Sequence, residues 1–236
     1  MTSFHLNWDE IDDVLLDMDG TLLDRHFDNF FFEEELPRRY ALLHGLSCEG
    51  SRDRLMAMYR SVEGELAWTD LDYWTERVGI DVVAMHKELD HMIGFLPSTE
   101  SFLQELKTLG RRVTILTNAH QSGVEVKIAK TGLDRHVERI VTASEVGYLK
   151  MRPAYWPTCQ RLVGFDPTRA LFIDDDEGCL AAAQQFGIPL DLASMSAILK
   201  VIPRRILCPA TSGCGASMCS IRWDGMRLGF LPNSTQ

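Results

Sequence analysis

The chain alternates short apolar runs with longer amphipathic segments over most of its length. The short runs end in polar residues and are typical of buried strands; they cover residues 14–16, 112–116, 139–142 and 170–173. The longer segments carry apolar residues at helical spacing and cover residues 102–109, 122–131, 154–163 and 177–186. Repeated strand–helix units of this kind predict an α/β fold, with a parallel sheet that has helices on both faces.

Between the first strand and about residue 96 the pattern is helical only. The predicted helices cover residues 33–44, 51–68, 71–78 and 82–93, and an aromatic cluster at residues 27–32 precedes them. Connections between a strand and the next helix are usually short, so this block is too long to be a simple crossover. We therefore expect an all-helical cap of residues 28–95, inserted into a core formed by residues 1–27 and 96–200.

Polar side chains follow three of the predicted strands. Asp17 and Asp19 come directly after the first, Thr117 and Asn118 follow the second, and residues 174–176 are three aspartates after the last. Ligands of open parallel sheets bind at the carboxyl ends of the strands, so these groups are expected to converge in one crevice. Several acids buried together require a shared cation or proton, and Mg²⁺ suits a few carboxylates. A single aspartate, such as Asp24 or Asp176, is more often a turn or helix-cap residue.

Bulk properties narrow the classes of function. The chain has 236 residues, which suits one domain with a smaller insertion, and its net charge of −10 argues against a nucleic-acid binder. The first residues lack a basic segment followed by an apolar one, and no apolar run approaches bilayer length. Six cysteines in such a chain favour reduced thiols. We expect a cytoplasmic protein without a membrane partner; its oligomeric state is left open.

The composition changes after Gly187. Residues 201–236 mix Gly, Ser, Cys, Pro and Arg without periodicity, and we expect an irregular tail there. The spacing of Cys208, Cys214 and Cys219 lacks the paired pattern of a structural zinc site. One hypothesis is that the tail derives from a shifted reading frame; the encoding DNA, read in the other frames, tests it.

The polar groups occur in an order that resembles the four motifs of the haloacid dehalogenase superfamily. The motifs are Asp17-Met18-Asp19-Gly20-Thr21, Thr117-Asn118, Lys150 and Asp174-Asp175. Within the superfamily, the segments 24–29, 71–74, 116–120 and 172–175, together with Trp8, resemble the bacterial GMP/IMP nucleotidase group. The resemblance implies a Rossmann-like core with a cap. Departures are the residues around Lys150, which lack the expected proline and acids, and the absence of a good strand after Gly187.

The resemblance also implies roles for these residues. Asp17 would be the nucleophile that forms an aspartyl-phosphate, and Asp19 the general acid and base. Thr117, Asn118 and Lys150 would bind the phosphoryl group. Mg²⁺ would be held by the Asp17 carboxylate, the Asp19 carbonyl and Asp175, with Asp174 bound directly or through water.

The expected activity is the hydrolysis of small phosphomonoesters, with purine 5′-nucleotides such as GMP and IMP as first substrates. The alternatives are a sugar-phosphate or phosphoglycolate phosphatase, a phosphomutase, and a non-catalytic phosphate-binding member of the family. The aromatic side chains of the cap have two interpretations: they stack on a purine base, or they form the hydrophobic core of the cap. These side chains are Trp68, Tyr73, Trp74 and the cluster at residues 27–32.

Overall fold

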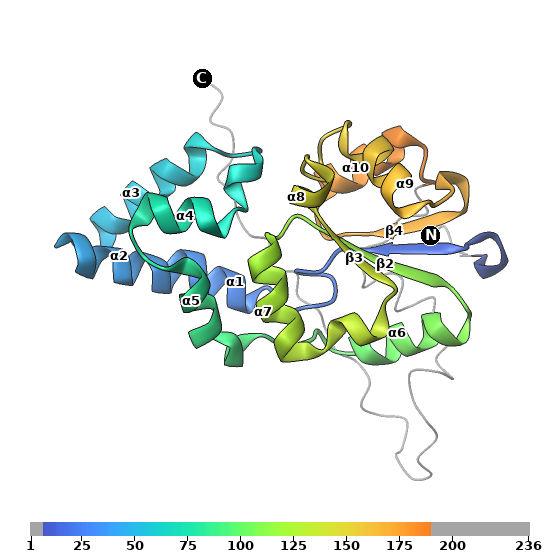
Figure 1. The fold of residues 1–236 in the computed structure, drawn as a ribbon, viewed down its shortest axis with the longest axis horizontal. Helices are drawn as coiled ribbons and strands as arrows, with labels where there is room; N and C mark the ends of the chain where they lie inside the picture. Colours follow the sequence, from blue (N-terminus) through green and yellow to red (C-terminus); the bar gives the residue numbers. More distant parts are fainter. Residues whose placement is uncertain (1–6, 190–236) are drawn as a thin grey trace, which may run out of the picture.

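The computed structural model describes residues 7–189, in which four parallel strands form one sheet (Figure 1). The order in the sheet is β3-β2-β1-β4, and the strands are β1 (Asp13–Leu16), β2 (Arg112–Thr117), β3 (Arg139–Thr142) and β4 (Ala170–Ile173). Each strand lies where the sequence predicts it, to within one residue at either end. The predicted α/β class with a parallel sheet is confirmed.

Helices cover both faces of the sheet because successive strand side chains point to opposite sides. Val14 and Leu16 of β1 pack in one cluster with α6 (Thr99–Thr108) and α7 (Gln121–Thr131). Leu15 packs in a second cluster with α9 (Tyr155–Val163) and α10 (Glu177–Phe186). All three β1 side chains are fully buried, and each contributes roughly 1.5–3 kcal/mol of burial free energy. The sheet therefore lies between two apolar clusters and forms the centre of this part of the molecule.

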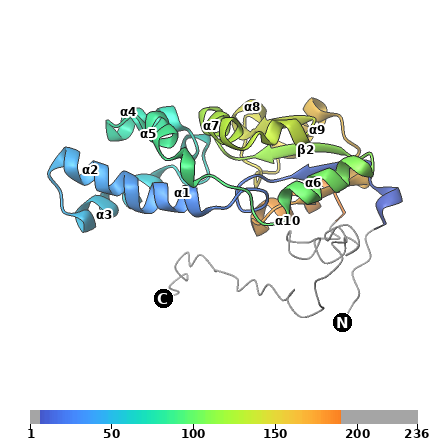
Figure 2. The ribbon, with the colours of Figure 1, turned by 90° about the horizontal axis from the view of Figure 1, so that it is seen from below.

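The remaining helices gather at one end of the sheet (Figures 1 and 2). The α-helices among them are α1 (His26–Phe30), α2 (Leu36–His44), α3 (Cys48–Ser61), α4 (Leu71–Val78) and α5 (Val82–Glu88). Short helical turns are η2 (Phe31–Glu35), η3 (Leu66–Trp68) and η4 (Asp90–Met92). The core has further short helices, namely η1 (Trp8–Glu10), η5 (Leu133–His136), α8 (Ala143–Val146) and η6 (Pro167–Arg169). The all-helical content agrees with a cap, and its boundaries at residues 28 and 95 stay a prediction.

Three predicted helices of the cap differ from the structure, and one of them, expected over residues 82–93, ends at Glu88 and is followed by the turn η4. The helix expected from residue 33 begins at His26, so the aromatic cluster is itself helical, and a π-helical turn separates α1 from α2 just before Pro37. Proline has no N–H to donate, and a local change of helical winding is a common way to accommodate it. The helix expected over residues 51–68 ends at Ser61, before Gly64, whose φ of 77° requires the left-handed region.

Single aspartates behave as the sequence indicates. Asp24 Oδ1 accepts a hydrogen bond from the His26 backbone N–H at 2.8 Å, and Asp176 Oδ1 accepts one from Cys179 N–H at 2.8 Å at the start of α10. None of the helices in residues 7–189 is long and apolar enough to cross a membrane. The predictions on residues 201–236 and their cysteines lie outside the described residues.

Candidate active site

The register of the sheet brings the predicted motifs to one edge. Leu16 aligns with Ile115 of β2 on one side and with Ile173 of β4 on the other. The Asp17 backbone N–H continues the ladder and donates to the Ile173 carbonyl at 2.8 Å. Asp17, Thr117 and Asp174 therefore lie side by side where their strands end, and all three are buried.

Lys150 joins the acids of this edge although it comes from a loop after β3. Its Nζ forms ion pairs with Asp17 Oδ1 and, at 2.7 Å, with Asp174 Oδ2. Asn118 Oδ1 accepts a hydrogen bond from the Lys150 backbone N–H at 2.9 Å, and Trp156 Nε1 donates to the Lys150 carbonyl at 3.0 Å. Residues of all four sequence motifs thus meet in one cluster.

Burial and charge act against each other in this cluster. Burial raises the pKa of the Asp17 carboxyl well above its usual range; the Lys150 ammonium opposes this, while the nearby Asp174 carboxylate adds to it. Burial alone would lower the pKa of Lys150, but the facing carboxylates of Asp17 and Asp174 raise it well above its usual value. Lys150 is therefore a cation, and it partly neutralises two buried acids.

The donor set fits a divalent cation. One oxygen each from Asp17, Asp174 and Asp175 lie within 4.8 Å of one another. Asp17 Oδ2 is buried and has no hydrogen-bond partner among residues 7–189. An unpartnered buried carboxylate oxygen is costly, and hard oxygen donors of this kind suit Mg²⁺. Both oxygens of Asp174 already accept hydrogen bonds, from Lys150 Nζ and from the Asp176 backbone N–H at 2.9 Å.

Gly20 allows the first motif and Asp175 to approach closely. Its φ of 97° lies in the left-handed region, and a Cβ there would collide with the Asp175 carboxylate and with the Arg25 side chain. Arg25 Nη1 lies 2.8 Å from Asp175 Oδ2. This pairing was not expected from the sequence, and it places a guanidinium at the rim of the site.

Asp19 lies in a second group of charges, which sequence reasoning missed. Its Oδ1 is 2.7 Å from Nζ of Lys127 on α7, and the same Nζ is 2.9 Å from Asp28 Oδ1 on α1. Lys127 is buried, with 3% of its surface exposed. A signal was present in the sequence: Lys127 lies three residues after the buried Val124, on the inward face of a helix, and a lysine there needs charged partners.

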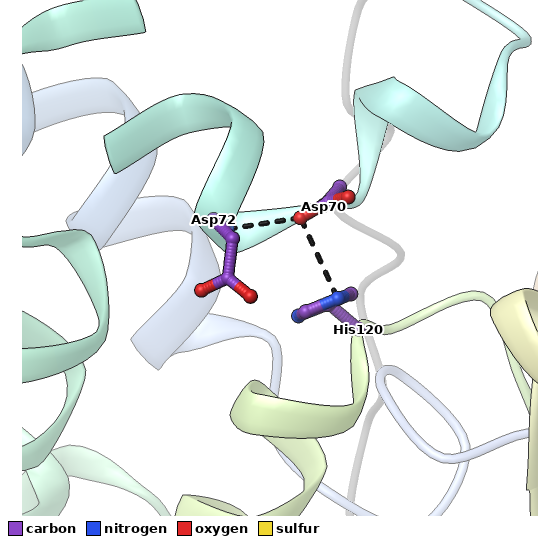
Figure 3. A group of neighbouring side chains, drawn as sticks. All are labelled: Asp70, Asp72 and His120. Atoms are coloured by element: carbon purple, nitrogen blue, oxygen red, sulfur yellow. Dashed lines mark hydrogen bonds and ion pairs between the residues drawn. The ribbon is translucent and has the colours of Figure 1, made fainter. Parts of the chain in front are cut away.

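A contact between the cap and the β2 loop involves Asp70, Asp72 and His120 (Figure 3). Asp70 Oδ1 accepts hydrogen bonds from the backbone N–H groups of Asp72 at 2.9 Å and Tyr73 at 3.1 Å, and so caps α4. His120 Nε2 lies 3.4 Å from the same oxygen. The start of α4 is thereby held next to the loop that follows Thr117, the last residue of β2, and contains Asn118.

A cavity of about 590 Å³ opens between the cap and the loop of Lys150, lined by residues 64–66, 147–149 and 152–154. Tyr148 is the exposed aromatic side chain in it, at 45% of its surface. Of the two interpretations of the cap aromatics, the core role holds for Phe27, Phe31 and Trp74, because these side chains are buried in the core cluster. Their apolar rings are more stable there than in a ligand pocket that must open to solvent.

Comparisons with known proteins agree on one family. A family model described as a haloacid dehalogenase-like hydrolase matches residues 11–187. The GMP/IMP nucleotidase YrfG of Escherichia coli (strain K12) is 39% identical over 186 residues, which cover 78% of this chain and 84% of that protein.

Solved structures share the fold. That of a HAD phosphatase from Thermococcus onnurineus superposes with a TM-score of 0.69 at 18% identity, covering 82% of this chain and 98% of the other. A HAD-superfamily hydrolase of subfamily IA from Geobacter sulfurreducens PCA gives a TM-score of 0.53 at 23% identity, with 76% and 85% covered. From the family match and the 39% identity to a curated relative, the chain belongs to the haloacid dehalogenase-like hydrolase family.

Proposed function

We propose that this phosphomonoester hydrolase is a Mg²⁺-dependent phosphatase that forms an aspartyl-phosphate on Asp17 and acts on purine 5′-nucleotides. The observation that carries the proposal is the Lys150 ammonium between the buried Asp17 and Asp174, with Asp17 Oδ2 unpartnered in the described part of the chain. A nucleophile must be fixed by its neighbours, and the ion pair of Asp17 Oδ1 with Lys150 does this; of the two Asp17 oxygens, one would attack phosphorus and the other would bind the metal.

The proposed reaction has two half-reactions, and Asp17 and Asp19 take part in both. The Asp17 carboxylate attacks phosphorus; the ester P–O bond breaks, and its electron pair goes to the leaving oxygen, which takes a proton from Asp19. A water molecule then gives a proton to Asp19 and attacks the phosphorus, so that the Asp17–phosphorus bond breaks and inorganic phosphate leaves. Asp19 ends each cycle as it began, in the protonated form.

The other residues bind charge and hold positions. Lys150 would contact the transferring phosphoryl group from the side of Asp17, and Thr117 is expected to donate its hydroxyl proton to a phosphoryl oxygen. Asp17 and Asp175 would bind Mg²⁺, while Asp174, whose oxygens are occupied, would mainly hold Lys150. Bound Mg²⁺ supplies charge neutralisation between an anionic nucleophile and an anionic phosphate.

The purine preference rests on two observations. The nucleotidase YrfG, whose name gives GMP and IMP as substrates, is 39% identical over 84% of its length. The cavity beside the Lys150 loop has a volume of about 590 Å³, which lies in the usual range for small-molecule sites. We expect a base to stack on the ring of Tyr148, which lines this cavity, and Arg152, fixed by a 2.8 Å hydrogen bond to the Gly64 carbonyl, adds positive charge.

A panel of phosphate esters tests the proposal. The purified protein is assayed by phosphate release from IMP, GMP, AMP, phosphoglycolate and glucose 6-phosphate, with Mg²⁺ and with EDTA. We expect the highest kcat/KM for IMP and GMP, and no turnover without the metal. Equal, poor rates on IMP and GMP would remove the purine assignment; an isomerised sugar phosphate would indicate a phosphomutase, and no turnover of any ester a non-catalytic protein.

A further inference from the structure

Lys127 is a buried cation that the proposed chemistry does not yet use. It lies in α7 with 4% of its side chain exposed, and its Nζ is within 3 Å of three carboxylate oxygens from two residues. The distances are 2.7 Å to Asp19 Oδ1 and 2.9 Å to each oxygen of Asp28. Lys127 Nζ donates hydrogen bonds to both oxygens of Asp28, and its contact with Asp19 Oδ1 is an ion pair.

The three charges join distant parts of the chain. Asp19 belongs to the motif after β1, Lys127 to a helix of the sheet, and Asp28 to α1, the first helix at the cap end of the sheet. The ring of Phe27 faces the ammonium, with its centroid 5.7 Å from Lys127 Nζ. Next to Phe27, the His86 ring packs at 5.1 Å between centroids, so the group is screened from water on the cap side.

This arrangement fixes one of the two oxygens of Asp19. Oδ1, next to Lys127, is buried, whereas the Asp19 side chain as a whole is 20% exposed. The part of Asp19 that reaches solvent is therefore not the oxygen next to Lys127. An aspartate held at one oxygen cannot rotate freely, and its other oxygen keeps one direction.

We propose that Lys127 and Asp28 are positioning residues that hold the Asp19 carboxylate in place for proton transfer to the leaving group. The inference rests on the proposed role of Asp19 as general acid and base. Asp28 neutralises and orients the ammonium, and Lys127 in turn holds Oδ1 of Asp19, which leaves Oδ2 to face the substrate. Because Asp28 lies on α1, the same contacts tie the first helix of the cap to the proton-transfer step.

The test uses two esters that differ in their need for a proton. The leaving group of 4-nitrophenyl phosphate departs readily as an anion, whereas that of phenyl phosphate depends more strongly on protonation. The parameter kcat/KM includes only the steps up to the first irreversible one, here the loss of the leaving group, so later hydrolysis does not mask the effect. We expect Lys127→Met to lower kcat/KM for phenyl phosphate on the order of 10²-fold, and for 4-nitrophenyl phosphate by less than about 10-fold.

Two further variants complete the design. Asp28→Asn leaves Lys127 in place but removes its second carboxylate partner. We expect the ratio of the kcat/KM values for the two esters to change in the same direction as in Lys127→Met, but by less. Lys130→Met is the matched control, because Lys130 lies on the same helix and pairs with Asp90 at 3.7 Å, far less buried than Lys127. Its ratio of the two kcat/KM values should equal that of the unmodified protein.

The ratio is measured on one sample with both esters, so a loss of folded protein cancels from it. If Lys127→Met lowers kcat/KM equally for both esters, Lys127 has a structural role only and the inference is wrong. The double variant Lys127→Met/Asp28→Asn, which leaves no unpaired Asp28 charge, must show the same ratio as Lys127→Met. Absence of Mg²⁺-dependent activity in the unmodified protein would instead overturn the proposed function itself.

Discussion

Two buried lysines of this molecule, Lys150 and Lys127, each lie between two aspartates. Lys150 pairs with Asp17 and Asp174 at the edge of the sheet, and Lys127 pairs with Asp19 and Asp28 where α7 meets the cap. The first cluster contains residues that contact the reacting phosphoryl group in our proposal. In the second cluster, Lys127 holds Asp19, the proposed proton-transfer residue, in position. Similar ion-pair geometry therefore serves binding in one place and positioning in the other.

The largest effect is expected from Asp17→Asn, which keeps the size of the side chain and removes the nucleophile. We expect kcat to fall on the order of 10⁴-fold or more, because no other carboxylate of the cluster can replace it. The matched control is Asp13→Asn: Asp13 is also buried on the same strand segment, but it pairs with Arg112 at 2.6 Å at the opposite end of β1. If Asp13→Asn lost activity equally, the effect would be one of stability.

A second prediction separates the two lysines directly. Lys150→Met removes charge from the phosphoryl site itself, so we expect kcat/KM to fall by about 10²–10³-fold for phenyl phosphate and 4-nitrophenyl phosphate alike. Lys127→Met should change the ratio of the kcat/KM values for the two esters. The comparison is broken if Lys150→Met changes this ratio as strongly as Lys127→Met, since both lysines would then act on the leaving group.

A third prediction concerns stability near the second cluster. Burial lowers the pKa of His86 to about 4 from its ordinary value of 6.5. The unfolded chain therefore binds this proton at higher pH than the folded chain. The contribution of neutral His86 to the free energy of unfolding is complete above pH 6.5 and is lost as the pH falls toward 4. The loss is about 3 kcal/mol, since one pKa unit corresponds to ~1.36 kcal/mol.

Urea unfolding between pH 7 and pH 4.5 measures this dependence. His86→Phe should reduce the loss of unfolding free energy on acidification, because the phenyl ring takes no proton. His91→Phe, at an exposed position of the same helical block, should leave the pH dependence unchanged. Identical pH dependence in all three proteins would show that His86 protonation does not control stability.

The smallest effect is expected at Gly20. Gly20→Ala imposes a left-handed conformation on alanine, which costs roughly 1–2 kcal/mol, and its Cβ also collides with the Asp175 carboxylate. Gly110→Ala is the matched control, because its φ of 66° is also positive but a Cβ there would meet no atom within 4 Å among residues 7–189. We expect weaker Mg²⁺ activation for Gly20→Ala only, measured as the Mg²⁺ concentration for half-maximal activity. Equal Mg²⁺ activation in both variants would show that Asp175 is not part of the metal site.

The first lysine cluster could be predicted from the sequence, whereas for the second cluster the sequence carries a signal only for the burial of Lys127 and none for its partners. Asp17, Thr117 and Asp174 follow apolar runs, so their place at the edge of a parallel sheet follows from alternation and topology alone. The role of Lys150 follows only from the motif order of the family that the sequence resembles. Asp28 and Lys127 are 99 residues apart and belong to different helices, and no local pattern specifies how the cap docks on the sheet.

The limits of local patterns also appear in the cap. The strands are predicted to within one residue, because each is a short apolar run bounded by polar residues. The π-helical turn at Phe31–Glu35 and the end of α3 depend on Pro37 and Gly64, whose effects on a helix vary with tertiary packing. Phe27, Phe31 and Trp74 have the spacing of both a core and a stacking surface, and only the packing distinguishes the two.

Chemical trapping of Asp17 tests the central claim most directly. The protein is mixed with Mg²⁺ and a phosphomonoester substrate, quenched with sodium borohydride, digested and analysed by mass spectrometry. Borohydride reduces an acyl phosphate to an alcohol, so the account predicts a substrate-dependent homoserine at position 17, with Asp19 unmodified. Reduction at Asp19 instead, or phosphate release during turnover without any modification at position 17, would contradict it.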